Sequence, residues 1–235
     1  MKITLFTGKT FNIQKTLGFN IKIVKSPRAK RMTLRIDSKE RLPILTIPER
    51  CSAKRAIEFV NQHKDWIDRS LAGLPQTKTF EDGEQISLFG SLVTIRHISG
   101  HHGTFLKDGT LNVSGDAEFM HRRIKDYIKI QAKSEFYHRS KVLAEHLGCP
   151  LNDVTIKDTK SRWGSCSSMH NINYSWRIAL APENVINYLI AHEVAHLKHQ
   201  NHSRDFWHCV RELYPEAESG KTWLRLHSRE LYRYE

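Results

Sequence analysis

The chain has 235 residues, 39% of them hydrophobic and 26% charged, which is typical of a soluble globular protein with room for one domain or two small ones. No apolar run approaches the roughly 18 residues needed to cross a bilayer, and the start lacks a signal peptide's apolar segment, so we expect a cytoplasmic protein without a membrane partner. Lys and Arg exceed Asp and Glu by 37 − 25 = 12, a basic balance that favours an anionic partner such as nucleic acid or a nucleotide.

The first half of the chain is predicted to be mainly strands. Alternating apolar residues predict three strands early in the chain, over residues 21–23, 32–36 and 42–47. Ser52 is a suitable N-cap for a helix that follows, and Gly73 stops it. The strand pattern returns over 80–115, with Asp108-Gly109 as a hairpin turn. We therefore expect a β-rich N-terminal region with one helix over residues 1–115.

The second half has a different order of elements. A helical pattern covers 117–147, and a final amphipathic helix is predicted from Lys221 onward. Between them lie short strand patterns, over residues 154–156, 163–165 and 172–178. A mostly apolar helix then begins at Pro182, a residue suited to the first helical position. The fold class is therefore predicted as α+β, with residues 116–235 forming a domain in which a helix lies under a small sheet.

Residues 192–196 of the helix that begins at Pro182 read His-Glu-Val-Ala-His. Two histidines four residues apart share one helix face and can converge on one ion at about 2.0–2.1 Å each. Glu193 lies beside the first histidine, where it can reach a water activated by the metal rather than the metal itself. The H-E-x-x-H spacing therefore predicts two zinc ligands, His192 and His196, and a general base, Glu193.

A catalytic zinc also needs a third protein ligand and an open fourth position. His199 continues the same helical face, but it lies about 10 Å from His192 along the axis, which would strain a tetrahedral site. His202 becomes available only if the helix ends within residues 197–201, and the last of these, an Asn, tolerates the left-handed conformation that ends helices. We favour His202. The alternatives are downstream carboxylates, Glu212 and Glu216.

The order of a helix, a small sheet and the motif helix is the arrangement of zincin-like proteases. In those proteins an edge strand above the motif helix pairs with an extended substrate through main-chain hydrogen bonds. Our candidate for that strand is Trp163-Gly164-Ser165-Cys166, because Gly164 would let another backbone approach closely. A developing oxyanion needs a further donor, for which the candidates are Arg162, Tyr174 and Arg177.

The segment RWGSCSSMHNINYSWRIALAPENVINYLIAHEVAHLKHQNHSRDFW resembles the YgjP-like (DUF45) family of zinc metallopeptidases, which is related to the SprT-like and zincin metalloproteases. That family pairs an R-W-G-S-C strand with H-E-x-x-H and a following N-H-S-x-x-F-W, and these motifs cover roughly residues 160–207 here. The resemblance implies that His192, His196 and His202 bind zinc and that Glu193 is the base. The spacing to His202 also equals that of metzincins, but His199 replaces their glycine, which argues against membership of that group.

These observations predict a zinc-dependent hydrolase, in the first place a metallopeptidase that acts on a peptide or protein. The basic charge motivates two alternatives. One is a metal-dependent nucleotide phosphohydrolase of the nucleoside triphosphate pyrophosphatase type, and the other is a DNA-associated protease or binding module. A fourth protein ligand such as His199 would favour a structural zinc over a catalytic one.

Overall fold

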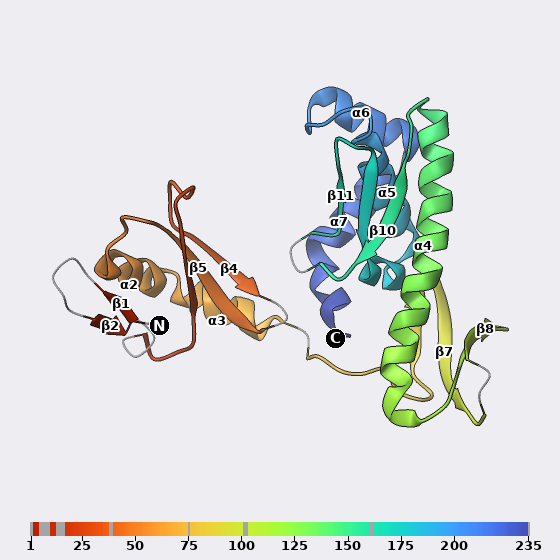
Figure 1. The fold of residues 1–235 in the computed structure, drawn as a ribbon, viewed down its shortest axis with the longest axis horizontal. Coiled ribbons are helices and arrows are strands. Elements are labelled where there is room, and N and C mark those ends of the chain that lie inside the picture. Colours follow the sequence, from red (N-terminus) through yellow and green to blue (C-terminus); the bar gives the residue numbers. More distant parts are fainter. Residues whose placement is uncertain are drawn as a thin grey trace. The chain divides into compact units, whose positions relative to one another are not determined.

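Figure 1 presents a computed structural model of the chain, which describes residues 2–4, 10–12, 17–37, 40–74, 76–100, 103–159 and 162–234. Small sheets and helices are mixed along the chain, so the predicted α+β class is confirmed. The structure separates into two compact units, Met1–Gln76 and Thr77–Glu235. This division falls earlier than the domain boundary expected at residue 115, because the strands that precede this residue share a hydrophobic core with the long helix that follows it.

The first unit contains a hairpin, a mixed sheet and two helices. The hairpin pairs β1 (Lys2–Thr4) with β2 (Thr10–Asn12), and the sheet has the order β3 (Lys22–Ser26), β5 (Leu42–Pro48), β4 (Thr33–Asp37). Ser52 caps α2 (Ala53–Gln62) by accepting a hydrogen bond from Arg55 N, as predicted. The single helix expected here is divided, because the backbone of His63 leaves helical geometry before α3 (Lys64–Ala72).

The second unit begins with a four-stranded sheet and a long helix. The sheet has the order β6 (Gln85–Leu88), β7 (Ser91–Ile98), β9 (Thr110–Ser114), β8 (Thr104–Lys107). Asp108 and Gly109 both have positive φ, 48° and 70°, in the predicted hairpin between β8 and β9. A 3-10 turn (Ala117–Phe119) then leads into α4 (Met120–His146). One face of α4 is buried because small and apolar side chains recur every four residues, at Ile124, Ile128, Ala132, Phe136 and Ser140.

A second, three-stranded sheet follows α4 in the order β10 (Asp153–Lys157), β12 (Asn171–Ser175), β11 (Gly164–Cys166). Strand β10 runs parallel to β12 and β11 runs antiparallel to it. Strand β12 ends at Ser175, earlier than predicted, and the chain continues as a buried 3-10 turn (Trp176–Leu180). Among the described strands β11 pairs only with β12, so it lies at the edge of this sheet as predicted.

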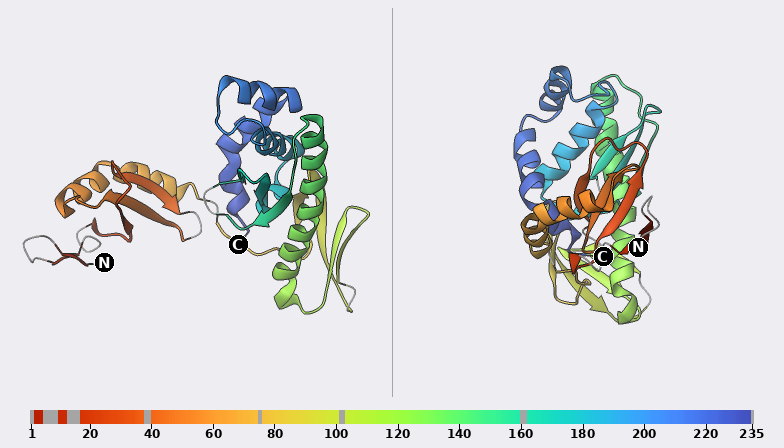
Figure 2. Two further views of the ribbon diagram at one scale, coloured as in Figure 1. Left: turned by 45° about the horizontal axis from the view of Figure 1, so that its top comes forward. Right: turned by 90° about the vertical axis from the view of Figure 1, so that its left-hand side faces the viewer.

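The motif helix α5 (Glu183–Ala195) lies behind the small sheet, between α4 and α7 (Ala217–His227), as Figures 1 and 2 show. The nearly continuous apolar sequence of α5 allows the helix to be buried on several sides. A Cβ atom at Gly220 of α7 would lie 2.5 Å from Tyr188 Cβ, so glycine lets α7 approach α5 closely. The chain between them forms α6 (Arg204–Leu213), and a 3-10 turn (Ser228–Tyr232) follows α7. None of the described helices combines the length and apolar character needed to cross a membrane.

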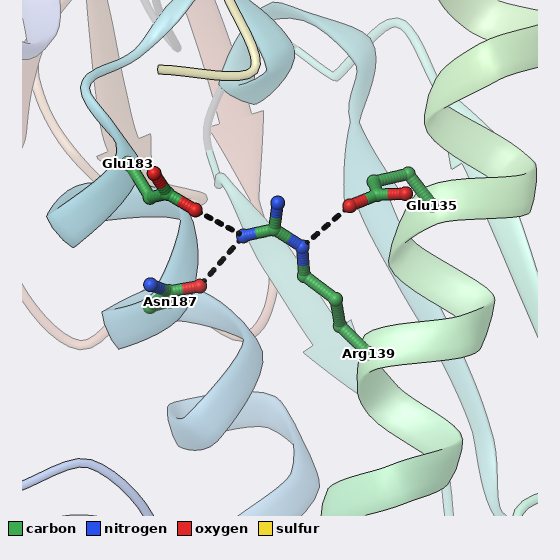
Figure 3. A network of polar contacts seen from close by, with 4 residues as sticks. All are labelled: Glu135, Arg139, Glu183 and Asn187. Atoms are coloured by element: carbon green, nitrogen blue, oxygen red, sulfur yellow. Dashed lines mark hydrogen bonds and ion pairs between the residues drawn. The ribbon is translucent and has the colours of Figure 1, made fainter.

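A polar network fixes α5 against α4, as Figure 3 shows. Arg139 of α4 donates from Nε to Glu135 Oε1 over 2.8 Å on its own helix. Its Nη1 reaches across to α5 and donates to Asn187 Oδ1 over 2.7 Å and to Glu183 Oε1 over 3.3 Å. The planar guanidinium of Arg139 donates hydrogen bonds to residues of both helices. It therefore holds the start of α5 in one position relative to α4.

Candidate metal centre

The local structure after α5 brings the third histidine back towards the first two. Helix α5 ends at Ala195, and a hydrogen bond from His199 N to Ala195 O over 2.9 Å tightens the turn. The break therefore falls just before the expected range of 197–201. Asn201 does not adopt the left-handed conformation invoked for it. Instead its Oδ1 accepts a hydrogen bond from Ser203 N over 3.2 Å, which shapes the loop before α6.

Three imidazoles converge at this turn. His192, His196 and His202 each offer one ring nitrogen, and these nitrogens all lie within 4.8 Å of one another, the one such group of His, Cys, Asp or Glu among the described residues. The Nε2 atoms of His192 and His202 are 3.2 Å apart. Two nitrogens bound to one tetrahedral zinc at about 2.05 Å would be about 3.3 Å apart, so this spacing fits a shared ion.

The protonation of the histidines also suits a metal. His196 Nδ1 lies 2.9 Å from His199 O, and because a carbonyl can only accept, Nδ1 carries the proton and Nε2 keeps its lone pair. Burial, helped by His196 and His202, lowers the pKa of His192 to about 3. Burial likewise lowers the pKa of His196. Both rings are therefore neutral at pH 7, which is the form that binds metals.

Aromatic side chains from α6 support the three histidines from behind. The ring centroid of Phe206 lies 4.5 Å from that of His196, 4.7 Å from His202 and 5.0 Å from His192. Trp207 stacks on His202 at 5.8 Å. Ser203 caps α6 by accepting a hydrogen bond from Phe206 N over 3.4 Å. This packing restricts the orientation of the imidazoles, and fully buried Phe206 excludes water from their rear side.

The carboxyl group of Glu193 lies between α5 and the edge strand β11. It is 4% exposed, and a Cβ atom at Gly164 would lie only 2.4 Å from its Oε1. Burial raises the pKa of Glu193 to about 8, while Arg162 opposes this effect. A divalent cation at the neighbouring histidines would also favour the charged form. The close approach of Gly164 explains why a glycine stands at this point of the strand.

If the chain cleaves peptides as its sequence predicts, replacing Gly164 by Ala is expected to lower kcat for this cleavage by about 10-fold or more, with the metal content unchanged. The added methyl group would meet the Glu193 carboxyl in a buried space, and a displacement of about 1 Å can cost up to about 100-fold. The measurement is steady-state peptide hydrolysis together with metal analysis. The substitution Ser91→Ala is the control, since Ser91 is exposed at the start of β7, outside the histidine cluster and the small sheet. Equal loss in both variants would contradict a steric effect on Glu193.

The other residues predicted to stabilise an oxyanion differ in position. Tyr174 is fully buried, and its hydroxyl lies 3.0 Å from Ser140 Oγ. Arg177 is 3% exposed and is paired with Asp158. Both therefore belong to the core rather than to a surface that a substrate could contact. Arg162 is exposed and lies close enough to Glu193 to lower its pKa, so it is the one of these three that the structure brings to the site.

The structure also shows the surroundings of Trp163 and Ser165, and of the residues considered as alternative metal ligands. Trp163 is half-buried beside Tyr232, with ring centroids 5.0 Å apart, and Ser165 Oγ accepts a hydrogen bond from Asn173 Nδ2 over 3.3 Å. Among the described residues, the three-histidine group does not include the alternatives considered for a third or fourth ligand, namely His199, Glu212 and Glu216. Sequence reasoning did not anticipate that His199 would act through its backbone carbonyl, because a main-chain contact leaves no signal in residue type.

Comparison with protein families agrees with this geometry. A family model described as YgjP-like, metallopeptidase domain, matches residues 30–227. No curated protein and no solved structure gives a match. The family match spans most of the chain, including the histidine cluster and the edge strand, and it confirms the resemblance noted in the sequence. The chain therefore belongs to the YgjP-like family of metallopeptidases, whose name implies a metal-dependent peptidase.

Proposed function

We propose that the chain is a zinc-dependent peptidase in which His192, His196 and His202 bind the metal and Glu193 is the general base. The observation that carries this proposal is the convergence of three imidazole nitrogens within 4.8 Å beside a buried carboxyl group. Three histidines form a ligand set that suits zinc better than magnesium or calcium, which prefer oxygen ligands. A three-ligand set also leaves one position open, as catalysis requires.

In the proposed reaction, the metal and the protein side chains have different roles. When bound, zinc would supply a Lewis acid that polarises the scissile carbonyl and lowers the pKa of water. Glu193 would accept the proton of the attacking water at its carboxylate and pass a proton to the leaving amine. Arg162 would donate hydrogen bonds to the developing oxyanion, a role supported by its exposure and its proximity to Glu193.

The edge strand would orient the substrate. Strand β11 pairs with β12 on one side only, so its other edge can accept an extended peptide through main-chain hydrogen bonds. Glu193 lies directly against this strand at Gly164. A peptide aligned on β11 would therefore carry its backbone past the general base, which favours a peptide bond as the group that is cleaved.

The proposal is tested by removing and restoring the metal. Treatment with a chelator is expected to abolish cleavage of unstructured peptides, and zinc is expected to restore it, as measured by mass spectrometry of the products. Nucleoside triphosphates are assayed in parallel, because a nucleotide phosphohydrolase and a DNA-associated module were the alternatives. The match to a metallopeptidase domain supports neither of them. Metal-dependent release of pyrophosphate without any peptide cleavage would overturn the peptidase proposal.

A further inference from the structure

A polar hollow of about 170 Å³ lies beside the edge strand β11, and it shares Arg162 and Gly164 with the functional site described above. The polar side chains around it come from all three strands of the small sheet and from the loop before β11, namely Lys157, Thr159, Arg162, Ser165, Asn173 and Ser175. Trp163, Gly164 and Tyr174 also line the hollow. The hollow is therefore next to β11, the strand along which the substrate is proposed to bind.

The register of the sheet shows on which face the hollow lies. Lys157 pairs with Ser175, and Ser165 pairs with Asn173. Residues paired across strands, and residues two apart on one strand, share a face, so these four side chains lie on one face of the sheet. Gly164 belongs to the opposite face, where Glu193 lies. Gly164 itself also lines the hollow, so the hollow and Glu193 both lie next to this one residue of β11.

The charge of the hollow is positive. Its two charged lining residues, Lys157 and Arg162, form no ion pair with another described residue. The carboxylate next to Lys157 in the chain, Asp158, is occupied by Arg177 and by Lys125, whose Nζ lies 3.2 Å away. Two unpaired cations around a small hollow favour the binding of an anion.

Ser175, one of the lining residues of the hollow, carries a hydroxyl group without a hydrogen-bond partner among the described residues. Ser175 is fully buried, and its hydroxyl makes no hydrogen bond within the described part of the chain. Buried hydroxyl groups in proteins are almost always paired, so an exception at the wall of a hollow points to a ligand that supplies the acceptor. This observation is independent of the two cations and indicates the same kind of ligand.

We propose that this hollow is a subsite for a carboxylate of the substrate, carried by an Asp or Glu side chain of the peptide aligned on β11. The proposal rests on the proposed function, which makes β11 the substrate-binding strand. Successive side chains of an extended peptide point to opposite faces of a sheet. A residue adjacent to the one that faces Glu193 therefore points to the side of the hollow. There Lys157 and Ser175 donate hydrogen bonds to its carboxylate, and the positive charge of Arg162, which donates to the oxyanion, adds to the attraction.

The test uses fluorescein-labelled peptides that share one sequence and carry Glu, Gln or Lys at one position, which is scanned along the peptide. At one position the Glu peptide is expected to have a kcat/KM about 10-fold above that of the Gln peptide, the ratio typical of one charged hydrogen bond. In Lys157→Glu this preference is expected to disappear and the Lys peptide to become the better substrate. Lys107→Glu, the same change at an exposed lysine of β8, is the matched control and should keep the preference.

Binding measured without turnover separates this subsite from the peptidase proposal. In the Glu193→Gln background, fluorescence anisotropy should still show tighter binding of the Glu peptide, and Ser175→Ala or Lys157→Glu should reduce the difference. If peptides are never cleaved but this preference holds, the subsite stands and the peptidase function fails. If peptides are cleaved but Glu and Gln peptides are treated alike, or if neither binds, the subsite is overturned.

Discussion

Glu193→Gln is expected to lower kcat for peptide cleavage by about 10³-fold while the protein keeps its metal, because general-base catalysis typically contributes 10²- to 10⁴-fold. The amide has nearly the same shape as the carboxyl group, so it fits the narrow space beside Gly164. It cannot take up the proton of the attacking water. The three histidine nitrogens are unchanged, so zinc binding should persist, as measured by metal analysis of the purified variant.

The matched control for this variant is Glu212→Gln, which makes the same change at an exposed position of α6 outside the histidine cluster. It should keep both metal and activity. If Glu193→Gln retained full activity, the proposed role of Glu193 would be refuted even with zinc bound. If it lost zinc together with activity, Glu193 would act on the metal site rather than on the proton.

The parts of the site that could be predicted from sequence are those fixed by local geometry. The spacing of His192 and His196 on one helix already places both rings on one face. Ser52 is a recognisable cap because an N-cap depends on residue type and the next three positions. The edge position of β11 was also predicted, since it followed from the order of the elements.

The parts that could not be predicted depend on contacts between distant segments. Tyr174, Arg177 and Arg162 were equivalent candidates in sequence, and only the folded chain shows that Tyr174 and Arg177 are buried while Arg162 is exposed. The orphaned hydroxyl of Ser175 and the approach of Gly164 to Glu193 arise in the same way. A shift of one residue in the register would move each of these side chains to the other face of the sheet.

His202→Ala is expected to weaken zinc binding by about 100-fold or more and to abolish peptide cleavage. Loss of a residue that merely supports a ligand already costs 10- to 100-fold in affinity, so loss of a ligand should cost at least as much. The remaining pair, His192 and His196, would be left on one helix face with two protein nitrogens for the ion. Zinc affinity is measured by competition with a chromophoric chelator, and circular dichroism checks that the fold is retained.

Two histidine controls make this result specific to His202. His208→Ala removes an exposed imidazole from the neighbouring helix α6 and should change neither affinity nor activity. His199→Ala is more discriminating, because His199 supports His196 through its backbone carbonyl, which alanine retains. If the side chain of His199 were a ligand, this variant would lose zinc as His202→Ala does. Retention of zinc in His199→Ala together with its loss in His202→Ala would therefore assign the third ligand and leave the fourth position open for catalysis.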